Sequence, residues 1–459
     1  MSRKCDILYI HPSQTPEGVS STKYACMPMG LIGILNNLRS KGYSVIGVNY
    51  AVEKTLNPDY TVDDTLNDVE YRVLLTDLHW YMHAYGAMHV AERSKHCRPE
   101  IPVVTGGYTG TIYGEEVIEK FPSVDYVVTG DSDLPMEMLI DHLLKGSTPL
   151  EQVPNLVYRQ DGKVVRSADT WVQTSLDEID FITADYFDHP DMVGYLTAGG
   201  VARRTTSRWI CIARGCKFNC SYCCGANANM QALFNRCNIL LRSPEKVADD
   251  FYRLEQQGIC HVSVSHDFYM FGKEYYQAVF AQIRKRNIKP GLYLECFQLP
   301  SKEFVDDLLQ TFDQDRLVLA FSPTTGNEQL RRENGKLFSN AALLEMIQYL
   351  QAKKVLFQLY YTMNPVGETA AQFNDTYIQM KYLHMVYGLS KNQIFYQRVV
   401  LDPLAGMRKH KAIKVEYNTF MDYYEHCKIP NTEYEVVGFD DGAEVSSQKK
   451  KELYDAIFG

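Results

Sequence analysis

The chain has 459 residues, of which 45% are apolar, and its 47 basic and 56 acidic side chains give a formal net charge of −9. This length exceeds what one ordinary core accommodates, so about two or three domains are expected. The negative charge excludes a general binder of nucleic acid or of membrane surfaces, because neither an overall positive field nor a polybasic run is present. No segment approaches the roughly 18 apolar residues that span a bilayer, and the first residues lack the apolar stretch of a secretory signal. The 12 cysteines in a chain without an export signal then indicate a reducing compartment, and we expect a cytoplasmic protein.

The first part of the chain, residues 1–146, alternates short apolar runs with helical patterns. Strand-like runs and helical spacing of apolar residues alternate along it, with Gly42 ending the first helix. The strands are expected at residues 6–10, 43–49, a run ending at Leu78, 101–105 and 124–129. This alternation predicts a doubly wound, Rossmann-like α/β domain with a parallel sheet and helices on both faces.

Two glycine sites follow the last strands of this domain, Gly106-Gly107 and Gly130-Asp131. Ligands of doubly wound sheets bind beyond the carboxyl ends of the strands, and glycine lets a bulky planar group approach the backbone. A turn without a ligand explains a glycine pair as well, so the glycines alone do not decide the question.

Residues 147–204 show weaker periodicity and more Pro, Gly and Asp, and we interpret them as a linker between domains. Within it, two apolar runs at residues 156–165 flank Asp161-Gly162, a dipeptide typical of a hairpin turn.

Three cysteines, Cys216, Cys220 and Cys223, follow a strand-like run at residues 209–213 with the spacing C-x3-C-x2-C. Thiolates select clustered iron or zinc, and this spacing lets three of them hold one iron–sulfur cube with one iron left open. A zinc site that also uses Cys211 and Cys224 is the alternative. Structural zinc usually shows a second paired knuckle, and the other cysteines are scattered singly. We therefore favour the iron–sulfur cluster and interpret Cys211 and Cys224 as small buried apolar residues.

Residues 205–402 carry six strand candidates with helical stretches between them, which predicts a partial (β/α)6 barrel. Polar residues end several of these strands, among them Asp267, Ser322 and Glu368. In parallel barrels this end carries the site, although a helix cap or a loop hydrogen bond explains each residue equally well. The strands are expected at residues 209–213, 261–265, 291–295, 316–321, 355–361 and 393–400. Residues 403–459 are expected to form a small C-terminal cap, with a substrate-reading module as the alternative.

The cysteine spacing, with Tyr222 before the last cysteine, resembles the radical S-adenosylmethionine (SAM) superfamily. The resemblance implies a [4Fe-4S] cluster on Cys216, Cys220 and Cys223, SAM bound at its open iron, and reductive cleavage of SAM by an external one-electron reductant. Strings around Ser322, Arg331 and Glu368 resemble the superfamily's SAM-binding segments, so Tyr222, Asp267, Ser322 and Glu368 are the expected SAM-binding residues. Thr324 stands where glutamate is common, and Glu295 or Glu328 could substitute for it.

The order Pro28-Met-Gly-Leu, then Val103 to Gly107, then Val124 to Asp133 resembles the cobalamin-binding domain that precedes the radical domain in one branch of that superfamily. This resemblance implies cobalamin as a cofactor and Gly106, Gly107, Tyr108, Thr109, Gly130 and Asp131 as its binding residues. The string Asp77-Leu-His79 resembles D-x-H-x-x-G, the motif that supplies a histidine to cobalt, but Met82 replaces its glycine and the motif should follow the first strand, near His11. We therefore expect no protein histidine on the cobalt.

Together, the resemblances imply a cobalamin-dependent radical SAM enzyme. We expect a methyltransferase that moves a methyl group from methylcobalamin to an unactivated carbon of a small molecule or peptide, with no nucleic acid and no membrane as partner. One alternative is a radical rearrangement, cyclisation or oxidation in which cobalamin is a redox partner. The other is a corrinoid or metal sensor without catalysis. The resemblance assigns no further catalytic residue.

Overall fold

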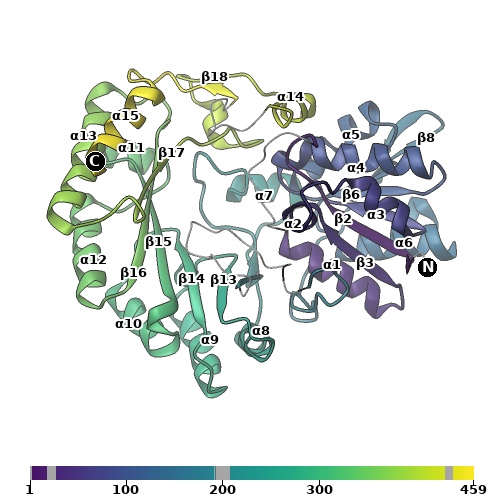
Figure 1. The fold of residues 1–459 in the computed structure, drawn as a ribbon, viewed down its shortest axis with the longest axis horizontal. Helices are drawn as coiled ribbons and strands as arrows, with labels where there is room; N and C mark the ends of the chain where they lie inside the picture. Colours follow the sequence, from purple (N-terminus) through teal and green to yellow (C-terminus); the bar gives the residue numbers. More distant parts are fainter. Residues whose placement is uncertain (1–2, 18–26, 191, 193–206, 430–437) are drawn as a thin grey trace. The chain divides into compact units, whose positions relative to one another are not determined.

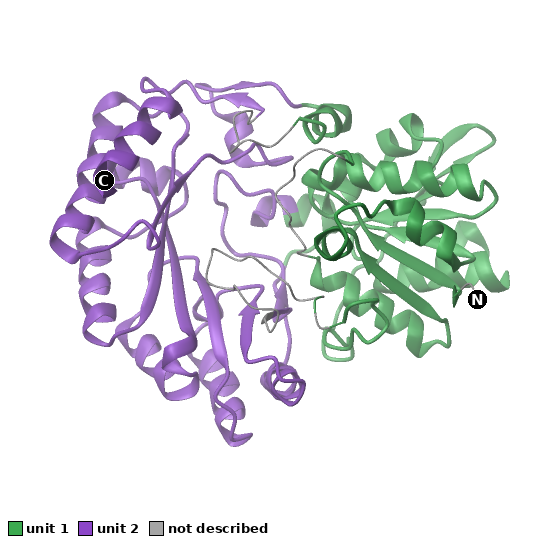
Figure 2. Cartoon of the chain, viewed as in Figure 1, with its two compact units in different colours: residues 1–206, 230–237, 418–432 green, residues 207–229, 238–417, 433–459 purple. Residues whose placement is uncertain are grey.

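The computed structural model describes residues 3–17, 27–190, 192, 207–429 and 438–459, drawn in Figure 1. They form two compact units, shown in Figure 2. Unit 1 combines residues 1–206, 230–237 and 418–432, and unit 2 combines residues 207–229, 238–417 and 433–459. Each unit is thus assembled from separate stretches of the chain, and each is described by itself below.

Unit 1 is built on a seven-stranded sheet with the strand order β3-β2-β5-β6-β7-β8-β9. The first five strands in this order are parallel. They are β3 (Val45–Asn49), β2 (Ile7–His11), β5 (Val73–Thr76), β6 (Val103–Gly106) and β7 (Tyr126–Val128). Along the chain, β2 is followed by β3 on one side, whereas β5, β6 and β7 follow one another on the other side. The sheet confirms the expected doubly wound domain.

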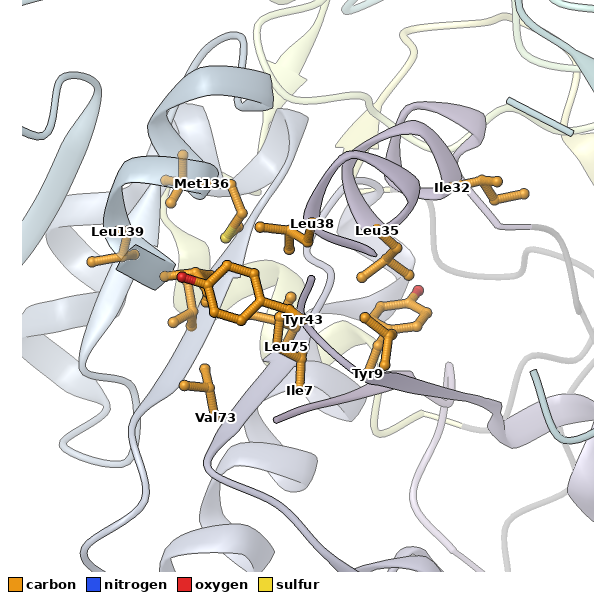
Figure 3. Packing of buried hydrophobic residues seen from close by; sticks show 14 of the residues in the cluster. Ile7, Tyr9, Ile32, Leu35, Leu38, Tyr43, Val73, Leu75, Met136 and Leu139 are labelled. Atoms are coloured by element: carbon orange, nitrogen blue, oxygen red, sulfur yellow. The ribbon is translucent and has the colours of Figure 1, made fainter. Parts of the chain in front are cut away.

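Four helices of unit 1 follow these strands along the chain: α1 (Met29–Ser40) after β2, α4 (Ala84–Cys97) after β5, α5 (Tyr108–Lys120) after β6 and α6 (Asp133–Lys145) after β7. Because crossovers between parallel strands are right-handed, the reversal of direction between β2 and β5 puts α1 on one face and α4 and α5 on the other. Figure 3 shows the core on the α1 face, where Leu35 and Leu38 of α1 and Met136 and Leu139 of α6 pack with side chains of β2 and β5. Short elements complete this part: α2 (Tyr50–Leu56), α3 (Val62–Asp68), β1 (Arg3–Lys4) and β4 (Val69–Glu70).

The hairpin expected at residues 156–165 is present, as β8 (Leu156–Gln160) and β9 (Lys163–Arg166) in antiparallel pairing. Asp161 and Gly162 in its turn both have positive φ, of 50° and 76°. The hairpin does not stand apart as a connector, because β8 pairs antiparallel with β7 and thereby extends the sheet of unit 1. The part of residues 147–204 that the structure describes therefore contributes to the unit 1 sheet, which differs from a simple linker; residues 191 and 193–204 lie outside the described residues.

Two distant segments also belong to unit 1. The first contains the end of α7 (Asn227–Phe234), where the ring of Phe234 lies 5.1 Å from that of Tyr108. The second contains α14 (Phe420–His426), whose first backbone N–H donates to Glu116 on α5 over 2.8 Å. The tail expected as one cap after residue 403 is therefore divided, with α14 in unit 1 and α15 (Ser447–Phe458) in unit 2.

Unit 2 is built on a six-stranded parallel sheet with the order β10-β13-β14-β15-β16-β17, which is also the order along the chain. Helices lie along one side of the curved strands, as Figure 1 shows for α9, α10, α12 and α13. The expected partial (β/α)6 barrel is confirmed. Its strands are β10 (Ser207–Ile210), β13 (His261–Val264), β14 (Gly291–Cys296), β15 (Leu317–Thr324), β16 (Leu356–Thr362) and β17 (Ile394–Gln397).

Several helices of unit 2 begin at residues whose side chains cap them. Ser243 accepts the N–H of Lys246 at the start of α8, with Pro244 in the first turn, and Ser301, Ser339 and Thr369 cap later helices in the same way. Besides α15, the helices of unit 2 include α8 (Pro244–Gln256), α9 (Lys273–Lys285), α10 (Lys302–Thr311), α11 (Glu328–Glu333), α12 (Asn340–Ala352) and α13 (Ala370–Tyr387). Two small antiparallel pairs, β11 (Ala213–Arg214) with β12 (Leu240–Leu241) and β18 (Lys414–Val415) with β19 (Phe439–Asp440), complete unit 2. In the described ranges, no helix is both long and apolar enough to traverse a bilayer.

Candidate active site

The three cysteines of the motif lie in one loop of unit 2, directly after β11. The loop turns on itself, because the N–H of Cys223 donates to the carbonyl of Cys220 over 3.3 Å and the N–H of Phe218 donates to Cys216 Sγ over 3.5 Å. All three thiols are half-buried. Burial raises the pKa of Cys216 and raises that of Cys223 to about 12. Cysteine thiols lose their proton when they bind metal, which offsets such a rise.

A second segment, Asn334-Gly335-Lys336 after α11, packs directly on the cysteine loop. The hydroxyl of Ser221 donates to Asn334 Oδ1 over 2.7 Å. Gly335 has φ +89°, and a Cβ placed on it would lie 3.0 Å from Cys220 Cα and 3.3 Å from Cys220 Sγ. A side chain here would therefore be strained by the left-handed backbone and would press against Cys220. The backbone thus forms a close-fitting wall against one of the three sulfurs.

Lys336, the next residue, brings a positive charge to the same place. It is 5% exposed, and its Nζ donates to the carbonyl of Phe297 over 3.0 Å. Burial lowers its pKa, while Cys220, Glu295 and Asp267 act on it in the opposite direction. A buried ammonium beside thiolates is favoured where the thiolates hold an anionic group, because the opposite charges offset the loss of hydration. The donor set, the glycine wall and this charge fit an iron–sulfur cluster.

The two additional cysteines of the zinc alternative have other contacts. The thiol of Cys211 is buried and donates to the carbonyl of Ala213 over 3.4 Å. The N–H of Cys224 donates to Asp402 Oδ2 over 3.2 Å, and burial raises the pKa of Asp402 to about 6. Among the described residues, no three His, Cys, Asp or Glu side chains are grouped as ligands of a single metal ion. A four-sulfur knot for one ion is therefore not preformed in this part of the chain.

The four expected SAM-binding residues lie in different settings. Tyr222 lies beside Cys220 and Cys223, and burial raises its pKa. Asp267 is buried and accepts two backbone N–H groups, from Tyr269 over 2.8 Å and from Phe297 over 3.0 Å. Its burial raises its pKa to about 7. Asp267 therefore shapes the loop that carries Phe297, and a direct contact with SAM stays a prediction.

Glu368 and Ser322 extend this set to the ends of β16 and β15. Glu368 is buried and forms an ion pair with Lys450 of α15, whose Nζ also donates to the carbonyl of Met363 over 2.7 Å. The other oxygen of Glu368 is buried and has no partner among the described residues. Ser322 is half-buried near the carboxyl end of β15. A role of either residue in binding SAM also stays a prediction.

The carboxyl end of β15 has an unusual backbone conformation. Thr324, which replaces the superfamily's common glutamate, has φ +63°, which is rare for a β-branched residue. Arg331 lies fully buried beneath it and donates to the carbonyls of Pro323 over 3.1 Å and Thr325 over 2.6 Å. The arginine thus fixes the strand end from within the fold, at a position where strain is often functional.

The inner face of the barrel strands carries polar and aromatic side chains. The hydroxyl of Tyr293 on β14 lies 3.3 Å from that of Tyr360 on β16, which donates to Gln358 over 2.9 Å. Tyr360 also stacks on Phe395 of β17, with ring centroids 4.9 Å apart. Parallel strands covered on both faces are usually apolar throughout. The alternation in Leu292-Tyr-Leu-Glu295 and in Phe357-Gln-Leu-Tyr360 was a readable signal of this face that the sequence analysis missed.

Glu295 is the acidic member of this face. Glu295 is exposed to solvent at this face. The protein atoms around its carboxyl group reduce its hydration and thereby raise its pKa. Tyr293 donates to it over 3.4 Å, and it acts electrostatically on both Tyr222 and Lys336. Glu295 therefore lies in the same neighbourhood as the cysteine loop. It is the only one of the two substitutes suggested for Thr324 that does so among the described contacts, since Glu328 binds Asn340 and Arg332 instead.

In unit 1, the expected cobalamin-binding residues lie at the carboxyl edge of the sheet. Gly107 has φ +108°, and a Cβ on it would lie 2.6 Å from His79 Cα. Thr109 donates to the carbonyl of His79 with its N–H and its hydroxyl, each over 3.1 Å. The ring of Tyr108 lies 6.4 Å from that of His79. Gly106, Gly107, Tyr108 and Thr109 are thus brought together with His79, and their contact with a corrinoid stays a prediction.

Gly130 and Asp131 follow β7 at the same edge. Gly130 has φ +63°, and its N–H donates to Thr111 over 2.9 Å. The carboxylate of Asp131 accepts the N–H of Gln173 over 2.9 Å and forms a buried ion pair with Arg236. Its charge is therefore balanced within unit 1, by an arginine that the sequence did not single out.

A group of buried polar side chains lies where the ends of β2 and β5 meet. Tyr9 and His11 Nδ1 each donate to Asp77 Oδ1 over 2.7 Å, and the His11 and His83 rings lie 4.8 Å apart. Burial lowers the pKa of His83 to about 3 and that of His79 to about 4. Within the described part of the chain, His11 Nε2, Asp77 Oδ2 and both ring nitrogens of His83 are buried without a hydrogen-bond partner. Buried unsatisfied polar atoms are few in native proteins and indicate a missing ligand or water, so this edge fits a cofactor.

Known families and curated proteins match this chain in part. Residues 18–140 match the family model described as the B12 binding domain. A stretch of 139 residues is 30% identical to an uncharacterized methyltransferase of Pyrococcus horikoshii, covering 30% of this chain and 28% of the relative. A stretch of 261 residues is 26% identical to the anaerobic magnesium-protoporphyrin IX monomethyl ester cyclase of Rubrivivax gelatinosus, covering 55% and 43%. The matches span less than half the length of these relatives.

Solved structures match over more of the chain. TsrM of Kitasatospora setae, a radical SAM methyltransferase solved with cobalamin and a [4Fe-4S] cluster, has a TM-score of 0.67 at 13% identity and covers 100% of this chain and 89% of its own. OxsB, a cobalamin-dependent SAM radical enzyme solved with aqua-cobalamin and SAM, has a TM-score of 0.60 at 12% identity and covers 94% and 58%. At these identities the likeness shows the fold. The resemblance inferred from the motifs is confirmed, because the chain contains a B12-binding domain and has the fold of cobalamin-dependent radical SAM enzymes.

Proposed function

We propose that this chain, with its B12-binding domain and the fold of the cobalamin-dependent radical SAM enzymes, is itself such an enzyme and transfers a methyl group to an unactivated carbon of a small molecule or peptide. The observation that carries the proposal is the set of three thiols in one loop, walled by Gly335 and accompanied by the buried ammonium of Lys336. Cys216, Cys220 and Cys223 would hold a [4Fe-4S] cluster that binds SAM, and the carboxyl edge of the unit 1 sheet would hold cobalamin.

When bound, these cofactors supply one-electron cleavage of SAM and a transferable methyl group, which are reactions that side chains alone do not perform. The chain's own residues would position them. Tyr222 lies between two of the cluster cysteines in sequence, and Arg331 fixes the strand end at Thr324. The inner barrel face, with Tyr293, Glu295 and Tyr360, offers hydrogen bonds and ring surfaces to a substrate.

The methyl-transfer proposal is supported by two matched proteins, since both the Pyrococcus relative and TsrM are described as methyltransferases. The second candidate is cyclisation or another radical reaction without methyl transfer. It is favoured by the match to the Rubrivivax cyclase, which spans more of this chain than the Pyrococcus match does. In either case the three cysteines have the same role, so the two candidates differ in products and not in the cluster site. A sensor without catalysis is the third, and it requires no SAM cleavage.

Anoxic reconstitution with iron, sulfide and hydroxocobalamin tests the proposal. We expect the absorption of both a [4Fe-4S] cluster and a bound corrinoid, and with dithionite we expect SAM to be cleaved. The variant Cys216→Ala/Cys220→Ala/Cys223→Ala should lose the cluster and the cleavage but keep the corrinoid. The matched control is Cys97→Ala/Cys237→Ala/Cys260→Ala, which removes as many thiols away from the loop and should keep all three properties. Absence of both cofactors in the wild type would refute the proposal.

Mass analysis of the products separates the candidate functions. Incubation with candidate substrates and methyl-labelled SAM should give S-adenosylhomocysteine and a product with the labelled methyl group. A product without the label and without S-adenosylhomocysteine would support the cyclase-like reaction. Cofactor binding without any SAM cleavage would support the sensor.

A further inference from the structure

The sheet of unit 1 reverses its direction of winding between β2 and β5. The chain passes from β2 to β3 on one side, and from β5 to β6 and β7 on the other. In such sheets the helices on either side of the reversal diverge, and a crevice for ligands opens at the carboxyl ends of the two strands. The residues that follow β2 and β5 are therefore the ones best placed to touch a bound ligand.

Four titratable side chains gather at this reversal: His11, Asp77, His79 and His83, which we call the switch-point cluster. His11 ends β2, Asp77 and His79 follow β5, and His83 lies in the 3-10 turn η1 (Tyr81–His83). His11, Asp77 and His83 are at most 5% exposed, and they contain the unpartnered nitrogen and oxygen atoms described above. Burial of this many unsatisfied polar atoms is costly in an apolar interior, so the cluster calls for a functional explanation.

His79 differs from the other members because it is only partly buried. The ring nitrogens form no hydrogen bond with any residue that the structure describes, and the ring has only edge contacts with Trp80 at 4.9 Å and Tyr108 at 6.4 Å. Its backbone, in contrast, is held tightly. Thr109 donates twice to its carbonyl, and Gly107 approaches its Cα so closely that no Cβ would fit. The backbone of His79 is thus fixed, while no described residue binds its ring nitrogens.

We propose that the imidazole of His79 is the protein ligand of the corrinoid cobalt, with Asp77, His11 and His83 as the buried groups behind it. The inference rests on the proposed function, since it requires that unit 1 binds cobalamin. Imidazole is a common nitrogen ligand of transition metals. Buried hydrogen-bonded carboxylates near such ligands orient them and strengthen their donation, and the carboxylate of Asp77 acts electrostatically on the His79 ring.

This assignment differs from the expectation that no protein histidine reaches the cobalt. That expectation used the order of strands along the chain, in which the D-x-H motif should follow the first strand. In the folded sheet, β2 and β5 are neighbours with paired residues from Ile7 to Ile10. A histidine that follows β5, the third strand of this sheet along the chain, therefore lies at the same edge of the sheet as a histidine that follows β2. Gly107 also supplies a close approach to the backbone of His79, which Met82 at the last motif position does not provide.

Electron paramagnetic resonance of the loaded protein tests the proposal. The probe is hydroxocobalamin, bound under anoxic conditions and reduced to the cobalt(II) form. In wild-type protein, an axial nitrogen should split the cobalt lines into triplets. In protein labelled with nitrogen-15 histidine the triplets should become doublets, because the nuclear spin of the ligand nitrogen changes. This labelling experiment alters no side chain, so it does not depend on the folding of a variant.

Two substitutions complete the test. His79→Gln should remove the nitrogen splitting, whereas His96→Gln, on the exposed side of α4, should retain it. Splitting that labelling does not change would show that the nitrogen belongs to the corrinoid's own base, and it would overturn the proposal. A spectrum without nitrogen splitting in the wild type would also overturn it, while leaving cobalamin binding intact. If the wild type took up no corrinoid, the proposed function and this inference would fail together.

Discussion

The two parallel sheets of this chain differ in where they leave room for a ligand. In unit 1, β2 and β5 are buried along their whole length, and partly exposed polar groups, such as His79, lie beyond the strand ends. In unit 2, β14 and β16 alternate between buried apolar residues and the polar inner face with Glu295 and Tyr360. A sheet covered by helices on both faces offers only its edge, whereas a curved sheet covered on one side offers a face. The same strand-and-helix repeat thus yields two kinds of site.

The largest effect is expected at Gly335, where the backbone of unit 2 lies against Cys220, one of the three motif cysteines. Gly335→Ala should abolish the binding of iron and sulfide, because the added Cβ would lie 3.3 Å from Cys220 Sγ. Gly258→Ala is the matched control, since Gly258 also has positive φ, of 76°, but has open space around its Cβ position. Both variants carry the cost of a left-handed residue, about 1–2 kcal/mol. Iron and sulfide content after reconstitution is the measurement, and equal content in both variants would contradict the role of Gly335.

A second test addresses the charge balance at the edge of unit 1. Arg236→Met removes the partner of the buried Asp131 carboxylate and should lower the free energy of unfolding by about 3–5 kcal/mol. Arg166→Met breaks the exposed pair with Glu115 and should lower it by at most about 1 kcal/mol. Urea denaturation followed by circular dichroism measures both. A small loss for Arg236→Met would show that Asp131 does not need its partner.

A substitution of Glu295 tests whether the inner face of unit 2 contributes to ligand binding and not to the stability of the fold. Its accessible carboxylate makes one long hydrogen bond, so Glu295→Gln should leave the free energy of unfolding within about 0.5 kcal/mol of wild type. SAM cleavage should fall about tenfold to a hundredfold, because a hydrogen bond to a charged group contributes about 1.5–3 kcal/mol. Glu303→Gln, at an exposed pair with Lys273, should change neither quantity. Unchanged cleavage in Glu295→Gln would remove this residue from the site.

The smallest effect is expected at Lys336. Its ammonium lies beside Cys220 and would stabilise added negative charge, so Lys336→Met should lower the reduction potential of the proposed [4Fe-4S] cluster. A shift on the order of 60 mV corresponds to about 1.4 kcal/mol for one electron. A redox titration followed by electron paramagnetic resonance measures it, with Lys302→Met on the surface as the control. A potential that rises or stays constant would contradict the assigned role.

Much of the fold followed from local patterns in the sequence. The alternation of short apolar runs and helical spacing predicted both parallel sheets, and the Asp161-Gly162 turn predicted the hairpin. These features depend on a few neighbouring residues, for which backbone preferences and periodicity suffice. The sequence did not show that the hairpin joins the sheet of unit 1. The residues of β8 do not specify β7 as their partner, because an isolated strand can pair with any free strand edge.

The candidate site was predictable only where a motif is contiguous. The three cysteines lie within one short string, but Ser221 and Asn334, which join the cysteine loop to the Gly335 segment, are 113 residues apart. Asp131 and Arg236 are 105 residues apart. Nothing local distinguishes Lys336 or Arg236 from surface residues, since their importance comes from burial. The proposed role of His79 likewise depends on the pairing of β2 with β5, which exists only after the sheet has formed.

The division of each unit among separate stretches of chain has a consequence for biosynthesis. Arg236 and α14 belong to the first unit, although most of the second unit is encoded between them. The amino-terminal stretch of unit 1 therefore leaves the ribosome long before α14 does. The Asp131 carboxylate has no arginine partner until Arg236 has also emerged. Vectorial folding, one domain after another, is the usual order for chains of this size. Here unit 1 is complete only after α14 has emerged, so most of unit 2 is synthesised before unit 1 can finish folding.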